Sequence, residues 1–246
     1  MPTPAPNLFV IPAYNEVENL PRLFQDLEAR PALFAPGSRL IIVDDGSVDG
    51  TAEFVDGYAG SLPAEVVRLG RNQGPGAAFR AGFAAALGTC GPQAFVVTLE
   101  ADTTGDLDAL PLMLERAAAG ADLVLANWVM ENVAWHRRAL SACAGAVMRR
   151  VLGIRAHTVS SFFRVYRASL LRDAVERYGD GLIREPGFAC KAELLSKLSG
   201  LGARIEEVPV TLDWSKRVGE SKMPLLRTIG AYWRMMARTR WERAAV

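Results

Sequence analysis

The sequence predicts an α/β fold, with a doubly wound, mostly parallel β-sheet that carries helices on both faces. Short apolar, β-branched runs alternate with stretches of helical spacing through the first half of the chain. Most of these runs lack the apolar–polar alternation of a half-exposed strand, so we expect strands buried on both faces, as in a parallel sheet. Each run ends in polar or glycine-rich residues, which parallel strands bring to one edge.

The first half of the chain predicts five strands and four helices in alternation. We expect the strands within residues 8–14, 39–47, 64–72, 94–102 and 121–128. The stretches between them combine helical spacing with helix-start signals, and they predict helices at residues 15–30, 50–58, 75–87 and 107–119. Right-handed crossovers then place the helices on both faces, with ligand sites at the carboxyl ends of the strands.

The second half, from about residue 128, follows a different pattern. It predicts helices near residues 137–152, 168–178 and 187–198 and a strand within residues 203–214, whereas the segment SSFFRVYR is assigned no element. No Pro-, Ser- or Gly-rich linker and no low-complexity tract divides the chain. We therefore expect residues 1–246 to form a single domain.

Composition and charge exclude several classes of protein. Of the 246 residues, 50% are hydrophobic, which is enough to bury a core without disulfides or a structural metal. The 28 basic and 27 acidic residues nearly cancel, so no nucleic acid partner is expected. Cys90, Cys143 and Cys190 lie far apart, with no CxxC motif or histidine cluster, which argues against a disulfide framework or a zinc site.

Neither a leader peptide nor a membrane span is recognisable. The start, MPTPAPNLFVIPAYNE, lacks the cationic and long apolar regions of a signal peptide, and no stretch of about 18 apolar residues could cross a bilayer. Together with the cysteine pattern, this predicts a protein of the reducing cytoplasm.

Two carboxylates one residue apart, Glu100 and Asp102, follow the apolar run VVTL. On extended backbone, side chains at i and i+2 point to one face, so both could converge on a divalent cation or a metal-bound diphosphate. Mg²⁺ and Mn²⁺ prefer oxygen ligands and keep water or phosphate oxygens in their shell, so two protein carboxylates suffice. The structural alternative is a solvated turn, with Asp106 capping the next helix.

A second acidic cluster follows the strand expected at residues 39–47. Asp49 is explained as a cap of the next helix, whereas Asp44 is well placed to accept hydrogen bonds from a nucleobase or a ribose. The glycine-rich turn GRNQGPGAAF matches neither a dinucleotide-binding fingerprint nor a P-loop. It is either a tight strand-to-helix turn or a loop that contacts a phosphate or base through backbone N–H groups.

Six short motifs occur in order between Val10 and Lys222: PAYNEVENL, VDDGSVDGT, LEAD, SSFFRVYR, EEVPV and GESK. In this order the chain resembles the family 2 glycosyltransferases of GT-A fold, most closely the polyprenyl (dolichyl) phosphate mannosyl- and glucosyltransferases. The resemblance implies a nucleotide-sugar-binding half at about residues 1–127 and an acceptor half at about residues 128–222. Residues 223–246 remain as a C-terminal helix.

The resemblance implies which residues contact the donor, a nucleoside diphosphate sugar. Pro12, Tyr14 and Glu16 match positions at the end of the first strand that contact the nucleoside, and Asp44 matches an aspartate that binds the base. The implied nucleotide-sugar-binding set is Pro12, Tyr14, Glu16, Ile42, Asp44, Glu100, Ala101, Asp102, Lys216, Arg217 and Lys222.

The resemblance also implies a metal and three catalytic residues. Glu100 and Asp102 match the metal-binding DxD motif of the family, with Asp102 as its last acid, and the implied cofactor is Mg²⁺ or Mn²⁺. Arg137 matches an arginine directed toward the acceptor phosphate, and Lys222 a lysine that meets the donor phosphates. Asp102, Arg137 and Lys222 are therefore the expected catalytic residues.

Several positions depart from the family pattern. Glu100 replaces an aspartate and is one methylene longer, and Thr104 stands where glutamine or serine is common. Trp128 occupies an arginine position, Thr158 an aspartate position and Lys216 another arginine position. Because lysine and arginine are not equivalent for bidentate phosphate binding, these changes leave the donor, the acceptor and full activity open.

Three functions are consistent with these residues. The first is inverting transfer of a hexose from a GDP-mannose or UDP-glucose type of donor to a polyprenyl phosphate, whose phosphate is already an anion near neutral pH and needs no base. Arg137, Arg138 and Arg164 could hold that phosphate. The second has a hydroxyl acceptor and needs a base, for which Glu185 in REPG is the best-placed candidate. The third is nucleotide-sugar binding with weakened catalysis.

Residues 223–246 predict an amphipathic helix with five arginines and one glutamate. Its apolar and basic residues take different faces, the apolar ones being Leu225, Ile229, Tyr232, Trp233 and Met236 and the basic ones Arg227, Arg234 and Arg238. This composition is typical of a helix among anionic lipid headgroups, which predicts peripheral contact with the inner face of a membrane. The alternatives are docking on its own domain or on the partner in a homodimer.

Overall fold

The first half of the chain forms the alternating strands and helices that its sequence predicts. The structure is a computed structural model that describes residues 5–102, 105–129, 145–154, 156–159, 161–211 and 225–244. The strands are β1 (Asn7–Ala13), β2 (Arg39–Asp44), β3 (Ala64–Arg68), β4 (Phe95–Thr98) and β5 (Leu123–Val129). The helices are α1 (Leu20–Glu28), α2 (Thr51–Asp56), α3 (Pro75–Thr89) and α4 (Leu110–Ala118), with short 3₁₀ turns at Pro31–Leu33 and Leu107–Ala109.

One helix start was predicted too early. The pattern placed a helix from residue 15, but α1 begins at Leu20. Asn15 has a φ of 53°, in the left-handed region, so the backbone turns there and cannot continue a right-handed helix. Pro21 sits in the first turn of α1, where its missing N–H and fixed φ are tolerated.

The second half adds two strands to the same sheet. They are β6 (Arg164–Arg167) and β7 (Ile205–Thr211), and the described strands lie in the order β3-β2-β1-β4-β6-β5-β7. β6 runs antiparallel to both β4 and β5, whereas the other pairings are parallel. The mostly parallel, doubly wound sheet is therefore confirmed. The strand within SSFFRVYR, inserted between β4 and β5, was not predicted.

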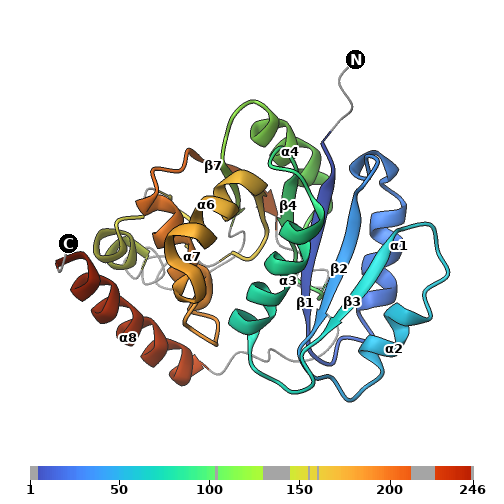
Figure 1. The fold of residues 1–246 in the computed structure, drawn as a ribbon, viewed down its shortest axis with the longest axis horizontal. Coiled ribbons are helices and arrows are strands. Elements are labelled where there is room, and N and C mark those ends of the chain that lie inside the picture. The colour runs from blue at the N-terminus through green and yellow to red at the C-terminus, as the bar shows by residue number, and fades with distance from the viewer. Residues whose placement is uncertain are drawn as a thin grey trace.

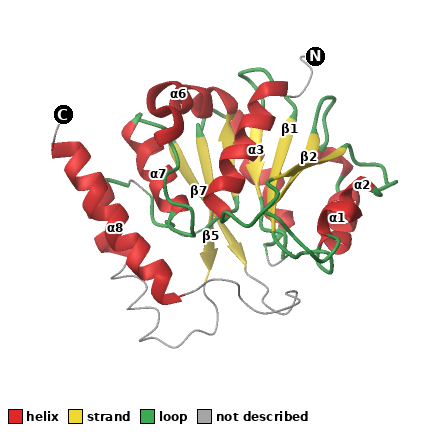
Figure 2. Ribbon diagram, turned by 60° about the horizontal axis from the view of Figure 1, so that its bottom comes forward, coloured by secondary structure: helices red, strands yellow, loops and turns green. Residues whose placement is uncertain are grey.

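Helices cover both faces of the sheet (Figures 1 and 2). Consecutive residues of β1 enter different cores: Val10 packs with α3, α6 (Ala168–Tyr178) and α7 (Cys190–Gly200), whereas Phe9 packs with α1 and α4. Both faces of the strand are buried, and its central residues from Leu8 to Ile11 are all apolar. This explains why the strand sequences show no alternation.

The C-terminal helix α8 (Leu225–Ala244) docks on its own domain, beside α7 (Figure 1). Ala231, Met235 and Met236 are buried in the core shared with α3, α6 and α7, while the side chain of Trp233 is 64% exposed. Docking was one of the alternatives open from the sequence. None of the described helices, α8 included, is both long and apolar enough to cross a bilayer.

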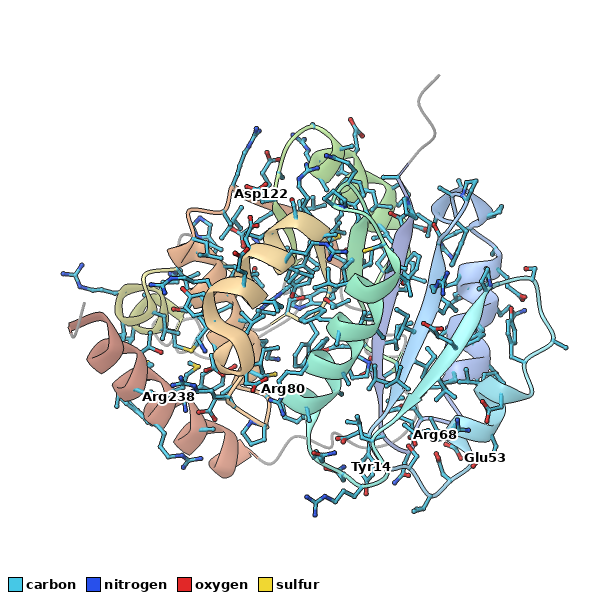
Figure 3. The ribbon with its side chains drawn as sticks, viewed as in Figure 1. Tyr14, Glu53, Arg68, Arg80, Asp122 and Arg238 are labelled. Carbon is cyan, nitrogen blue, oxygen red and sulfur yellow. The ribbon has the colours of Figure 1, made fainter. Side chains whose placement is uncertain are left out.

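A buried carboxylate on α7 joins α8 to the rest of the molecule. Glu193, which is 1% exposed, accepts hydrogen bonds at 2.8 Å from the backbone N–H groups of Arg184 and Glu185. Its other oxygen lies 2.7 Å from Lys197 Nζ and 2.8 Å from Arg238 Nη2 on α8 (Figure 3). A carboxylate is stable in this environment only when it is paired and hydrogen-bonded, as Glu193 is.

Arg238→Met should therefore destabilise the protein although it lies on a terminal helix. We expect the free energy of unfolding to fall by about 2 kcal/mol, the range for a hydrogen bond to a charged group. The matched control is Arg234→Met, an exposed arginine one turn earlier, for which we expect a change within about 0.5 kcal/mol. Urea unfolding measures both, and equal losses in the two variants would contradict the role of the Arg238 pair.

Candidate functional site

The predicted nucleotide-contacting residues of the first two strands meet at one edge of the sheet. Ala13 at the end of β1 pairs with Asp44 at the end of β2, and the backbone N–H of Asp45 donates to the carbonyl of Ala13 at 2.8 Å. Tyr14 consequently lies at the same edge as Arg68, which ends β3, whereas Asp122 lies at the opposite edge (Figure 3). Pro12 and Ile42 are on the paired strands that lead into this edge.

The three acids that follow β2 have different roles. Asp44 is 5% exposed and its Oδ1 accepts the Ser47 N–H at 3.0 Å, which shapes the turn. Asp49 accepts the N–H of Thr51 at 3.0 Å and its hydroxyl at 2.6 Å, so it binds the first residue of α2, although the N-cap position itself is Gly50. Burial alone would raise the pKa of Asp49, but the hydrogen bonds from Thr51 and Val17 hold it below its ordinary value.

Asp45 holds the glycine-rich turn, a role that the sequence analysis missed. Its carboxylate accepts the N–H groups of Gln73 and Gly74, each at 2.7 Å. Burial raises the pKa of Asp45 more than these two hydrogen bonds lower it, and the neighbouring carboxylate of Asp44 raises it further. No motif marked this contact, because the two segments are 28 residues apart in the chain.

The amides at the start of α3 are used within the protein. The Gly76 N–H donates to the carbonyl of Pro186 at 2.8 Å, and the Gln73 and Gly74 amides bind Asp45. A Cβ on Gly76 would lie 2.0 Å from the carbonyl oxygen of Glu185, so only glycine allows this contact. These bonds favour the structural alternative, a tight turn packed on residues 184–187, over a phosphate cradle made of the same amides.

The acidic pair lies beyond β4. β4 ends at Thr98, so Glu100 and Asp102 lie in the following turn and the expected extended backbone at the pair is wrong. Ala101 between them is 5% exposed and belongs to the core, while both carboxylates are half-buried at the surface. Glu100 also lines a hollow with Trp128, a position where the family pattern has arginine.

These two carboxylates fit a hard divalent cation. In the part of the chain that the structure describes, no group of three or more His, Cys, Asp or Glu side chains could hold a metal by itself. A pair of half-buried carboxylates leaves coordination positions for diphosphate and water oxygens, which is how proteins usually bind Mg²⁺ with a phosphate substrate. The donor set of Glu100 and Asp102 therefore fits Mg²⁺ or Mn²⁺ bound together with a nucleoside diphosphate.

Two residues considered for the acceptor have structural roles instead. Arg164 is 1% exposed, and its guanidinium donates to the carbonyls of Lys191 at 3.0 Å and Val159 at 3.2 Å. Glu185, the candidate base, is 5% exposed, and its Oε1 lies 3.1 Å from Arg238 Nη2. These contacts with the backbone and with α8 favour structural roles for both side chains.

The remaining predicted site residues are divided between the described and undescribed parts of the chain. Thr158, at an aspartate position of the family, donates its hydroxyl to Asn127 Oδ1 at 2.7 Å and its N–H to Glu207. Glu16 receives the Asn19 side-chain amide at 2.6 Å. The candidates Thr104, Arg137, Arg138, Lys216, Arg217 and Lys222 lie outside the described residues.

Comparisons with known proteins agree with the motif order. The family model described as Glycosyl transferase family 2 matches residues 8–174. The polyprenol monophosphomannose synthase of Mycolicibacterium smegmatis is 31% identical over 223 residues, covering 88% of the chain and 80% of that protein. The undecaprenyl-phosphate mannosyltransferase of Micrococcus luteus is 33% identical over 226 residues, covering 88% of the chain and 86% of that protein.

Solved structures with the same architecture include glucosyl-3-phosphoglycerate synthase from Mycobacterium tuberculosis, in complex with Mn²⁺, UDP and glucosyl-3-phosphoglycerate. It matches the chain with a TM-score of 0.67 at 21% identity, covering 98% of the chain and 81% of that structure. At this identity the likeness shows a shared fold.

The contact between the glycine-rich turn and residues 184–187 can be tested by adding one methyl group. Gly76→Ala forces the two segments apart, and we expect the free energy of unfolding to fall by about 2 kcal/mol, within the range for overpacked sites. A Cβ on Gly88, in the same helix, meets no atom within 4 Å, so Gly88→Ala should stabilise the protein by about 0.5 kcal/mol. Thermal unfolding followed by circular dichroism compares them, and a Gly76→Ala protein as stable as wild type would contradict the contact.

Proposed function

The chain belongs to glycosyl transferase family 2, and on this basis we propose that it transfers a hexose from a nucleoside diphosphate sugar to a polyprenyl phosphate. Its fold is the GT-A fold. The observation that carries the proposal is the similarity, over 88% of the chain, to two enzymes named for sugar transfer to polyprenyl phosphates. The donor we propose is of the GDP-mannose or UDP-glucose type, with inversion at the anomeric carbon.

The first half of the chain supplies the donor site in this proposal. Residues 1–127 carry the sheet edge at which β1, β2 and β4 end, with Tyr14 and Asp44 placed for the nucleoside. Asp45 and the glycine-rich turn beside it shape the edge, and the amides of Gln73, Gly74 and Gly76 are engaged within the protein. Residues 128–222 then supply the acceptor site, where we assign Arg137 to the acceptor phosphate and Lys222 to the donor phosphates.

Glu100 and Asp102 are the residues that would hold Mg²⁺ or Mn²⁺. When bound there, the cation would neutralise charge that builds on the departing diphosphate. The two side chains would hold the ion next to the diphosphate, and buried Ala101 between them is part of the core.

A phosphate acceptor agrees with the burial and pairing of Glu185, the carboxylate considered as a base. A hydroxyl acceptor needs a base within hydrogen-bond reach, and Glu185, considered for that role, is buried and paired with Arg238. A phosphate monoester has its second pKa near about 6 and is already an anionic nucleophile at neutral pH. Transfer to a polyprenyl phosphate therefore requires positioned cations and no proton acceptor.

The proposal is tested with purified protein, labelled GDP-mannose and UDP-glucose, Mn²⁺, and polyprenyl phosphate or water. Lipid-soluble label is the expected product, and EDTA should abolish it.

Asp102→Asn should lower the turnover number by about 100-fold or more, since it removes one ligand of the charge-neutralising cation, while leaving the thermal unfolding temperature unchanged. The exposed Asp173→Asn on α6 is the matched control. Donor hydrolysis without lipid label would contradict the acceptor, and an active Asp102→Asn would contradict the metal site.

Peripheral membrane contact is proposed through the outer face of α8. Trp233 and Arg234 are exposed there, next to the buried Met235 and Met236, so an apolar–polar pair faces solvent on a docked helix. Tryptophan at such a boundary and arginine near anionic headgroups both favour an interfacial position. The protein would then contact a lipid-linked acceptor at the bilayer surface, where the acceptor phosphate lies.

Trp233→Ser should weaken binding to vesicles of anionic phospholipid about tenfold, because the indole no longer enters the interface. Val175→Ser, an exposed apolar residue on α6 with 43% exposure, controls for a general loss of surface hydrophobicity and should change nothing. Sedimentation with vesicles at low and high salt measures both. Equal binding of the Trp233 variant and wild type would remove α8 as the contact.

A further inference from the structure

Lys191, at the start of α7, places an ammonium group between two aromatic rings. Its Nζ lies 4.4 Å from the ring centroid of Phe162 and 5.7 Å from that of Phe188. Among the described residues, none forms a hydrogen bond or ion pair with this Nζ. The aromatic faces attract the charge of the ammonium without using its N–H groups, so its three donors stay available to a ligand.

The ammonium lies on the same side of the molecule as the acidic pair. Thr98, the last residue of β4, donates its hydroxyl to the carbonyl of Phe162 at 2.5 Å, which holds the Phe162 backbone beside the strand end that leads to Glu100. Burial lowers the pKa of Lys191, and the carboxylate of Glu100 partly offsets this, so the two charges act on each other electrostatically.

The surroundings of Lys191 are positive and largely apolar. It lines a hollow with Phe79, Phe162, Arg164, Tyr166 and Cys190, and no carboxylate is part of this lining. The Nε of Arg164 is buried there without a hydrogen-bond partner. Because the carbonyls of Lys191 and Val159 hold the guanidinium of Arg164, the ammonium of Lys191 is the cation of this hollow that is left for an anion.

The position of Lys191 in its helix strengthens this argument. It is the second residue of α7, where the partial positive charge of a helix N-terminus repels a cation. A lysine with only a structural role packs its stem on apolar surface and extends its ammonium into water. The ammonium of Lys191 instead lies against Phe162 and is partly buried. An anion bound there would stabilise its charge.

We propose that Lys191 binds a phosphate oxygen of the reacting ligands, near the metal-binding pair Glu100 and Asp102. This inference rests on the proposed function. The phosphate belongs either to the diphosphate of the donor or to the monophosphate of the acceptor. In both cases the ammonium would add its positive charge to that of the cation that Glu100 and Asp102 would hold.

The experiment compares Lys191→Met, which keeps the apolar stem, with Lys191→Arg, which keeps the charge. Calorimetry measures the Kd of GDP and UDP with Mn²⁺ and again in EDTA, and steady-state assays measure KM for polyprenyl phosphate. A donor role predicts a Kd at least about tenfold higher for Lys191→Met with and without metal, the change expected for about 1.4 kcal/mol. An acceptor role predicts the same increase in KM for polyprenyl phosphate with an unchanged nucleotide Kd. In either case Lys191→Arg should recover most of the loss.

The matched control is Arg177→Met on α6, an exposed cation whose guanidinium lies 6.0 Å from the Tyr178 ring centroid, outside both hollows. It should change neither constant, and thermal unfolding verifies that all variants are folded. A folded Lys191→Met protein with both constants within twofold of wild type would overturn the inference while leaving the proposed function standing. If wild type bound neither nucleotide and transferred no sugar, both would fail.

Discussion

The burial of one carboxylate, Glu193, organises the part of the molecule next to the candidate site. It binds the backbone at residues 184–185, Lys197 on its own helix and Arg238 on α8. The turn that it holds packs through the carbonyls of Glu185 and Pro186 on the glycine-rich turn at the start of α3. A helix at the end of the chain is thereby connected to the edge where the donor is proposed to bind.

Some charged residues at this edge stabilise the fold, and others remain for the reaction. Asp45, Glu185 and Arg164 are buried and engaged with backbone or with α8, so they maintain the shape of the site. Glu100, Asp102 and Lys191 keep contact with the surface instead. This division matches a reaction in which an anionic acceptor displaces a diphosphate. Such a reaction depends on placed positive charge and not on a general base.

The departures from the family pattern are accommodated by local packing. Trp128 packs on Phe163 with ring centroids 6.3 Å apart, beside the hollow that Glu100 lines. Thr158 is tied to Asn127 on β5 and to Glu207 on β7. Both residues are uncharged, whereas the resemblance implies an arginine at position 128 and an aspartate at position 158. Lys191 restores one positive charge near the acidic pair from a different element, α7.

Local sequence was sufficient to predict the strands and helices of the first half and the family, because apolar periodicity, turn residues and motif order are properties of neighbouring residues. It did not reveal β6, whose pairing with β4 and β5 joins segments far apart in the chain. Nor did it show that Asp45 and Glu193 have structural roles, that Glu185 is paired, or that Lys191 lies against the Phe162 ring. Those roles depend on which distant groups share a buried space, and burial decides whether a charge is used for packing or left for a ligand.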